Sequence, residues 1–80
     1  MLESKIQSKL IKDLEKQGWY VVKIISCNKN GFPDLVCLKE NEYKLIEVKT
    51  ISGKLSPIQV YRHKEMKGLN LNVEVYKPIE

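Results

Sequence analysis

Two runs of apolar and β-branched residues, separated by a short polar turn, limit the folds that this chain can adopt. The runs are 34–38 (Asp-Leu-Val-Cys-Leu) and 43–50 (Tyr-Lys-Leu-Ile-Glu-Val-Lys-Thr), and Asn41 lies between them. Such runs joined by a short turn are typical of an antiparallel hairpin. We therefore expect a hairpin at the centre of the domain, paired about Asn41 so that residue 34 lies opposite 49 and residue 36 opposite 47.

The flanking segments predict two helices and two further strands. Residues 3–17 repeat apolar side chains at helical spacing, and 19–25 are rich in aromatic and β-branched residues, which favours a strand. Ser-Pro-Ile-Gln at 56–59 is a helix start with a capping box, and 72–76 predicts a last short strand. The predicted order is α-β-β-β-α-β, an α/β fold with a mixed sheet flanked by helices, in a single domain over residues 1–80.

The net charge of +4 is concentrated in one stretch of the chain. Residues 49–67 hold five basic side chains and one acid, and the rest of the chain carries nine of each sign. A local basic field suggests a polyanionic partner, although a solvated lysine-rich helix has the same composition. On the second predicted helix, several polar and basic side chains recur at intervals that could follow a phosphate backbone. The residues expected to contact DNA are Lys54, Arg62, His63, Lys64 and Lys67.

Neither a membrane segment nor a metal-binding cysteine motif is visible. No run approaches the ~20 apolar residues of a membrane-spanning helix, and the first residues lack the apolar stretch of a signal peptide. These features predict a cytoplasmic protein without a membrane partner. Cys27 and Cys37 form no CxxC motif, so we expect two reduced thiols rather than a disulfide or a zinc site.

The third predicted strand carries an acid and a base where a core strand would be apolar. Glu47 and Lys49 share one face of this strand, because side chains alternate between faces. In the hairpin, Asp34 lies opposite this region, and cross-strand or diagonal neighbours are ~5–8 Å apart. Asp34 and Glu47 could therefore share one cation, with the backbone carbonyl of Val48 as a further ligand.

Two carboxylates with open water positions suit Mg²⁺, with Mn²⁺ as a substitute. Such a cation polarises a phosphodiester and lowers the pKa of bound water. Lys49 would orient or deprotonate that water, or neutralise the charge that develops on the phosphate. The alternative is that Glu47 and Lys49 form an exposed surface pair and that Asp34 only follows Pro33 in a turn. The pattern alone leaves both interpretations open.

A resemblance to a known family favours the first interpretation. Gly-Phe-Pro-Asp at 31–34, followed thirteen residues later by Glu47 within Ile-Glu-Val-Lys, resembles the PD-(D/E)xK nuclease superfamily. The finer similarity is to the VRR-NUC (virus-type replication-repair nuclease) family. That family typically shows an early helical Glu, a G-x-PD element, an E-V-K strand and a downstream Gln. The matching positions are Glu3, 31–34, 47–49 and Gln59, in that order over nearly the whole chain.

The resemblance implies a restriction-endonuclease-like fold and Mg²⁺- or Mn²⁺-dependent hydrolysis of DNA. The short chain is similar to the stand-alone form associated with viruses and phages, which would act in the host cytoplasm. Stand-alone members are associated with homodimers that act on branched DNA, including four-way junctions. A dimer is also physically reasonable, because a domain this small buries only about 60% of the surface of its unfolded chain.

Two of the matched residues have alternative roles. Glu3 lies within the apolar stripe of the first helix and could bind the metal, directly or through water, but an acid in a first turn also favours the helix dipole. Gln59 could act in catalysis or could only complete the capping box with Ser56. His63 is the only histidine, and a lone histidine on a polar helix face is often merely solvated.

We therefore expect a structure-selective, metal-dependent DNA endonuclease with Asp34, Glu47 and Lys49 as catalytic residues and Glu3 and Gln59 as further candidates. A competing function is a non-catalytic nucleic-acid-binding module. The intact acid-acid-lysine set argues against it, since a pure binder has no need of two acids near a polyanion. A protein interaction module would instead show no metal dependence and no salt-sensitive DNA affinity.

Overall fold

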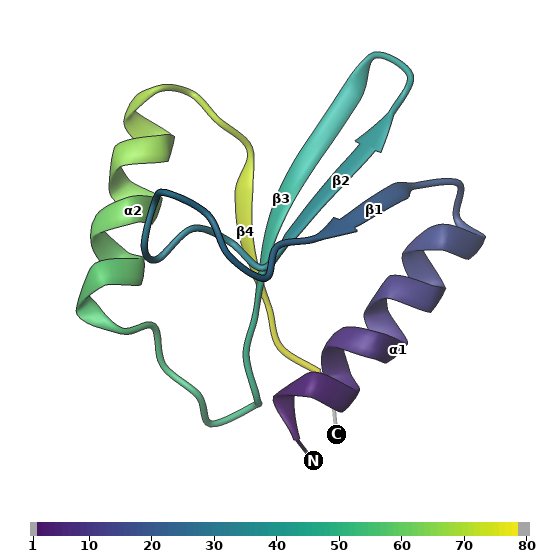
Figure 1. Cartoon of the computed structure of the whole chain (residues 1–80), viewed down its shortest axis with the longest axis horizontal. Coiled ribbons are helices and arrows are strands. Elements are labelled where there is room, and N and C mark those ends of the chain that lie inside the picture. Colours follow the sequence, from purple (N-terminus) through teal and green to yellow (C-terminus); the bar gives the residue numbers. More distant parts are fainter. Residues whose placement is uncertain (1, 79–80) are drawn as a thin grey trace.

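A four-stranded mixed sheet forms the centre of the computed structural model, which describes residues 2–78 (Figure 1). The strands lie in the order β1-β2-β3-β4; the first three pair antiparallel, and β4 runs parallel to β3. The predicted order of elements and the mixed sheet are confirmed. The elements are α1 (Glu3–Lys16), β1 (Tyr20–Lys23), β2 (Leu35–Lys39), β3 (Glu42–Val48), α2 (Pro57–Gly68) and β4 (Val73–Tyr76).

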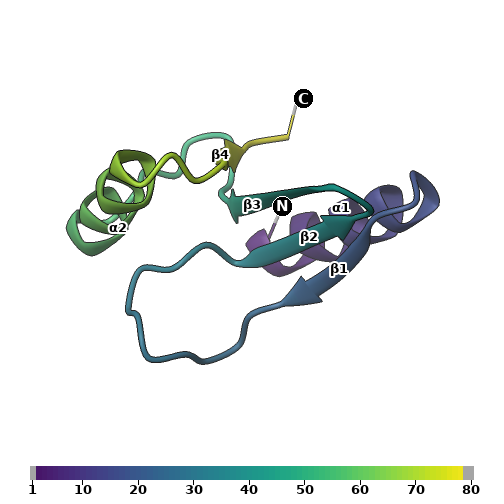
Figure 2. The same ribbon diagram turned by 90° about the horizontal axis from the view of Figure 1, so that it is seen from above.

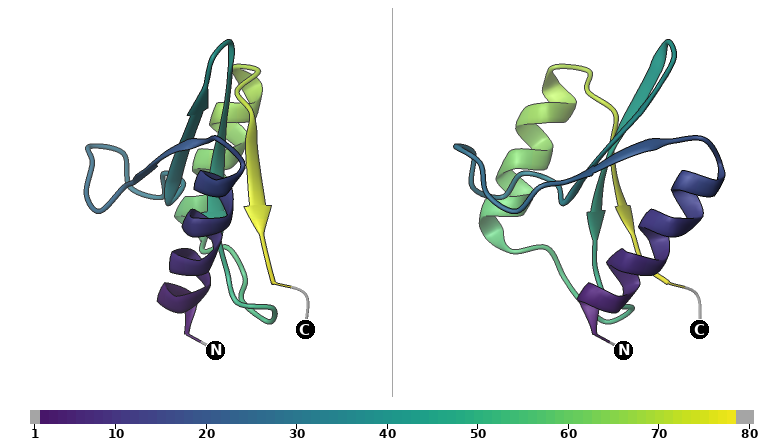
Figure 3. Two further views of the ribbon diagram at one scale, coloured as in Figure 1. Left: turned by 90° about the vertical axis from the view of Figure 1, so that its right-hand side faces the viewer. Right: turned by 45° about the vertical axis from the view of Figure 1, so that its right-hand side comes forward.

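The two helices cover opposite faces of this sheet (Figures 1 and 3). The apolar stripe of α1 packs on the β2 and β3 side chains of one face, including Leu35 and Ile46. The other face carries a smaller cluster, in which Met66 of α2 packs with Leu45 and Val73. Because side chains alternate along β3, Glu47 shares the face of Leu45 and therefore points toward α2.

The register of the central hairpin differs from the predicted one by two residues. Leu35 pairs with Ile46 and Lys39 with Glu42, so the predicted pairing of 36 with 47 is wrong. The cause is the tight turn: only residues 40 and 41 connect the strands, and Asn41 adopts a positive φ of 65°. A shift by two residues keeps every side chain on its predicted face. Asp34 therefore still lies on the face of Glu47, and continuing the register by one step beyond the Leu35–Ile46 pair places it opposite Glu47.

The segment 24–34 between β1 and β2 leaves the sheet and extends toward α2 (Figure 2). The observed strand β1 is shorter at both ends than the predicted strand 19–25. It begins at Tyr20 and ends at Lys23, and Ile25 beyond it is 89% exposed. The Ile24 N–H still donates to the Asp34 carbonyl at 2.8 Å, which closes the base of this loop.

Two further observations concern the cysteines and the helices. Cys27 is exposed, Cys37 is buried, and both are free thiols. None of the helices in residues 2–78 is long and apolar enough to cross a membrane.

The first turn of α2 has the predicted capping box. The Ser56 hydroxyl accepts a hydrogen bond from the Gln59 backbone N–H (3.3 Å), and the Gln59 side-chain oxygen accepts one from the Ser56 N–H (2.8 Å). These two bonds satisfy donors that a helix start otherwise leaves without partners. They fix the end of α2 that lies nearest in sequence to Glu47 of β3.

Replacing Ser56 by alanine should lower the free energy of unfolding by about 1 kcal/mol, because the cap of α2 is lost. Urea unfolding followed by circular dichroism measures this change. Ser8→Ala is the matched control, since the Ser8 hydroxyl only bonds the Ser4 carbonyl within α1 (3.0 Å). A loss in Ser56→Ala no larger than that in Ser8→Ala would contradict the role of the cap.

Candidate active site

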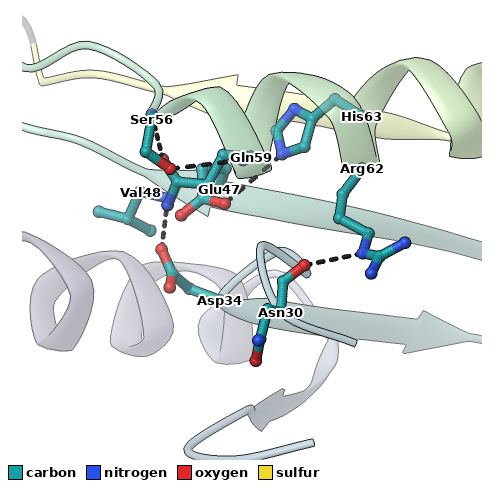
Figure 4. Close-up of polar contacts among 8 residues, drawn as sticks. All are labelled: Asn30, Asp34, Glu47, Val48, Ser56, Gln59, Arg62 and His63. Carbon is teal, nitrogen blue, oxygen red and sulfur yellow. Dashed lines mark hydrogen bonds and ion pairs between the residues drawn. The ribbon is translucent and has the colours of Figure 1, made fainter. Parts of the chain in front are cut away.

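Glu47 is a carboxylate in the interior of the protein, with 1% of its surface exposed. One of its oxygens, Oε1, lies 3.5 Å from Nε2 of His63 on α2 (Figure 4). Burial and the adjacent Asp34 carboxylate raise the pKa of Glu47 to about 8, and the Glu3 charge adds to this, while the nearby Lys49 ammonium acts in the opposite direction. At neutral pH, positive charge in addition to that of Lys49 is therefore needed to favour the ionised form of Glu47.

Asp34 is held in place by the backbone of β3. Its Oδ2 accepts a hydrogen bond from the Val48 N–H at 2.9 Å (Figure 4). This bond connects the residue just before β2 with the last residue of β3, so the hairpin itself sets the position of the Asp34 carboxylate beside Glu47. The other carboxyl oxygen of Asp34 is not used by this bond.

Lys49 directly follows β3 and is half-buried. Its backbone N–H donates to the Tyr76 carbonyl at 3.0 Å, which continues the β3–β4 pairing. The charge of the Lys49 ammonium lowers the pKa of both Glu47 and His63. The structure thus brings Asp34, Glu47 and Lys49 together on the α2 side of the sheet.

The oxygen donors at this place fit a hard divalent cation. Glu47 is buried, and its carboxylate and that of Asp34 repel each other when both are ionised. Within residues 2–78, no group of three His, Cys, Asp or Glu side chains is placed to hold a metal ion. Two carboxylates, a backbone carbonyl and water match the way proteins usually bind Mg²⁺, which retains several waters.

Glu3 does not join Asp34 and Glu47 in a three-acid group. It is half-buried in the first turn of α1, where an acid is favourable to the helix dipole, and its charge contributes to the raised pKa of Glu47. Gln59 has its side-chain oxygen engaged in the capping box. The part of Gln59 that remains available for a substrate is its amide –NH₂ group.

His63 does not lie on the exposed side of α2, although it was predicted to contact a phosphate backbone. Only 5% of the residue is exposed, and its ring points from α2 toward Glu47 (Figure 4). The predicted phosphate contact from His63 is therefore wrong. Gln59, His63 and Met66 recur on the inner side of α2, and the apolar Met66 was the sequence signal that this side is buried.

Arg62 is engaged within the protein rather than exposed for DNA. Its Nε donates to the Asn30 carbonyl at 2.7 Å, and its guanidinium pairs with Glu65 at 3.1 Å. Gly31 makes this contact possible: its φ is +81°, and a Cβ there would lie 2.7 Å from the Ile58 carbonyl oxygen. The contact with Asn30 fastens the loop preceding Asp34 to α2, and the DNA contact of Arg62 stays a prediction.

The remaining predicted DNA contacts are on the surface. Lys64 and Lys67 lie on the exposed side of α2, and Lys54 lies in the loop before it. Lys67 is close enough to His63 for its charge to lower the pKa of the imidazole. The exposed lysines of this part of the chain therefore lie on α2 and on the loop that leads into it from β3.

Comparison with known proteins identifies the family. The family model described as the VRR-NUC domain matches residues 2–77, nearly the whole chain. The chain belongs to the VRR-NUC family. VRR-NUC domains are nuclease domains, so the acids and the lysine described above lie in a domain of a nuclease type. A search of curated proteins found no match to the chain.

The raised pKa of Glu47 makes the stability of this VRR-NUC domain depend on pH. The folded protein keeps a proton on Glu47 up to about pH 8, whereas the unfolded chain loses it near the usual value of 4.5. The contribution of Glu47 to stability is therefore present below 4.5 and is lost as the pH rises toward 8. His63 acts oppositely, because its lowered pKa reduces stability only as the pH falls below about 6.5.

In EDTA, we expect the free energy of unfolding to fall as the pH rises from about 6.5 to 8, and Glu47→Gln should remove most of this fall. Urea unfolding at several pH values measures it. Glu74→Gln, which removes an exposed acid from β4, is the control and should leave the slope unchanged. Equal slopes in Glu47→Gln and the wild type would show that Glu47 is ionised in the fold.

Proposed function

We propose that this VRR-NUC protein is a metal-dependent DNA endonuclease with Asp34, Glu47 and Lys49 as its catalytic residues. The observation that carries the proposal is the buried Glu47, 1% exposed, beside Asp34 and a lysine in a nuclease-family domain. Two adjacent acids in a protein interior are unfavourable for folding unless a cation neutralises them. A site built at this cost to stability is better explained by catalysis than by DNA binding alone.

Mg²⁺ is the cation we propose, with Mn²⁺ as a substitute. The Asp34 and Glu47 carboxylates would hold it together with the Val48 carbonyl, and water would complete its coordination. When bound, the ion would polarise the scissile phosphate and lower the pKa of a bound water. The charge of the same ion would offset the burial and the Asp34 repulsion that together keep the pKa of Glu47 high.

The residues of the chain have distinct tasks in this scheme. The Val48 N–H bond to Asp34 keeps one carboxyl oxygen fixed and leaves the other for the cation. Lys49 provides a half-buried ammonium that orients the attacking water and neutralises charge developing on the phosphate. The free amide –NH₂ of Gln59 is a further donor for a phosphate oxygen. Glu3 acts on the site only through its charge or through water.

The DNA is proposed to approach over the exposed lysines around the site, Lys54, Lys64 and Lys67. Branched DNA such as a four-way junction is the proposed substrate, and a homodimer the proposed assembly, by resemblance to stand-alone VRR-NUC proteins of viruses and phages. A symmetric dimer would present one site to each of two strands. The proposed place of action is the cytoplasm of the host cell.

Asp34→Asn should reduce cleavage by about a hundredfold or more, because it removes a cation ligand charge while an amide oxygen can still accept the Val48 N–H bond. The assay uses labelled duplex, single-stranded, flap and four-way-junction DNA with Mg²⁺, Mn²⁺ or EDTA. Glu47→Gln should behave alike. Glu74→Gln makes the same change of charge at an exposed position of the sheet and should cut normally.

Cleavage in EDTA, or wild-type cleavage by Asp34→Asn, would contradict the metal site. DNA binding by the wild type without cleavage of any substrate would favour the non-catalytic nucleic-acid-binding module. Equal cutting of duplex and junction would contradict selectivity for branched DNA, and a monomer by sedimentation in the presence of the junction would contradict the dimer.

Lys49→Met should lower kcat by about 10²–10³-fold, because it removes the positive charge proposed to stabilise the transition state. The affinity for Mn²⁺, measured by calorimetry, should be unchanged or tighter, since a cation near both acids is lost. Lys12→Met on the exposed side of α1 is the charge-matched control. A rise in KM with unchanged kcat would instead assign Lys49 to DNA binding.

A further inference from the structure

Two buried polar atoms of the site lie close together, and neither forms a hydrogen bond within the described residues. They are Oε1 of Glu47 and Nε2 of His63, 3.5 Å apart (Figure 4). The residues that carry them are 1% and 5% exposed. Buried polar groups are nearly always hydrogen-bonded in folded proteins, so two orphaned atoms at contact distance call for an explanation.

The surroundings of His63 favour an apolar side chain at this position. The inner side of α2 continues into the cluster of Met66, Leu45 and Val73, and leucine would complete that surface without an unsatisfied nitrogen. A histidine here is unfavourable for packing unless its ring nitrogen has a partner. The Glu47 carboxylate oxygen Oε1 lies 3.5 Å from His63 Nε2 and can be that partner.

We propose that His63 is a positioning residue for Glu47: its Nε2–H donates to Oε1 and so fixes the rotation of the carboxylate. This inference rests on the proposed metal-dependent function. Figure 4 shows the second oxygen of Glu47 on the side of Asp34, away from the imidazole. Holding one oxygen on the ring therefore directs the other toward the place where the two acids would share a cation.

The imidazole suits this role as a neutral donor. A neutral ring has one N–H and adds no charge to the site, so it orients the carboxylate without competing with a cation for it. Groups that orient a metal-binding side chain in this way typically affect metal affinity or activity by about 10–100-fold when removed.

The chain contains a single histidine, which allows a test without mutation. In ¹⁵N NMR of the untagged protein with saturating Mg²⁺, the proposal predicts that the proton of the neutral ring is on Nε2. A ring protonated only on Nδ1 would overturn the proposal, since Nε2 would then have no hydrogen to donate.

Two substitutions separate the hydrogen bond from packing. His63→Leu should weaken Mn²⁺ binding by about 10–100-fold in calorimetry and lower kcat, with the melting temperature maintained or raised. His63→Gln offers an amide N–H that reaches a similar position and should restore binding to within a few-fold. Met66→Leu, one turn away on the same side of α2, is the packing control and should bind Mn²⁺ like the wild type.

Wild-type Mn²⁺ affinity in His63→Leu, or equal loss in His63→Leu and His63→Gln, would overturn the inference. Failure of the proposed function has a different signature: Asp34→Asn and Glu47→Gln would then also bind Mn²⁺ like the wild type. If those two variants lose Mn²⁺ binding while His63→Leu keeps it, the proposed metal site is supported and only the positioning role of His63 is contradicted.

Discussion

The hydrogen bond from the Val48 N–H to Asp34 is the contact on which the candidate site depends. It joins the start of β2 to the end of β3, so the acid before one strand is placed by the backbone of the next. The neighbour of Val48 on each side is a proposed catalytic residue, Glu47 or Lys49. One backbone bond of 2.9 Å therefore fixes Asp34 relative to both, and the α1 core beneath, which contains Val48, keeps that backbone in place.

The burial of Glu47 that the proposed function requires lowers the stability of the fold. Glu47 shares its face of β3 with Leu45, where an apolar residue would have enlarged the small cluster under α2. Its burial beside Asp34 favours the protonated form, which cannot serve as a strong ligand for a cation. Binding of the proposed divalent ion would reverse that preference, because the ion would favour the ionised carboxylate. Metal binding and folding should therefore reinforce each other in a domain that is small enough to need such help.

Much of this structure could be predicted from the sequence, and the misses have definite physical causes. The order of elements, the capping box and the grouping of Asp34, Glu47 and Lys49 follow from local patterns of period two and period 3.6. The hairpin register could not be predicted from these patterns, because it depends on whether Asn41 takes a positive φ in a two-residue turn. The burial of His63 and the internal contacts of Arg62 depend on how α2 is rotated over the sheet, and its few apolar residues only weakly specify that rotation.

α2 divides its surface between three tasks, and this explains why its polar residues are not interchangeable. Its outer side exposes Lys64 and Lys67, its edge fastens the loop before Asp34 through Arg62, and its inner side places His63 on Glu47. The capping box at Ser56 fixes where the helix begins and hence which residue falls on which side. A rotation of one residue, about 100° on a helix, would exchange a buried imidazole for an exposed ammonium. The site therefore needs the helix in one orientation, and Gly31 secures it by letting the loop backbone approach Ile58.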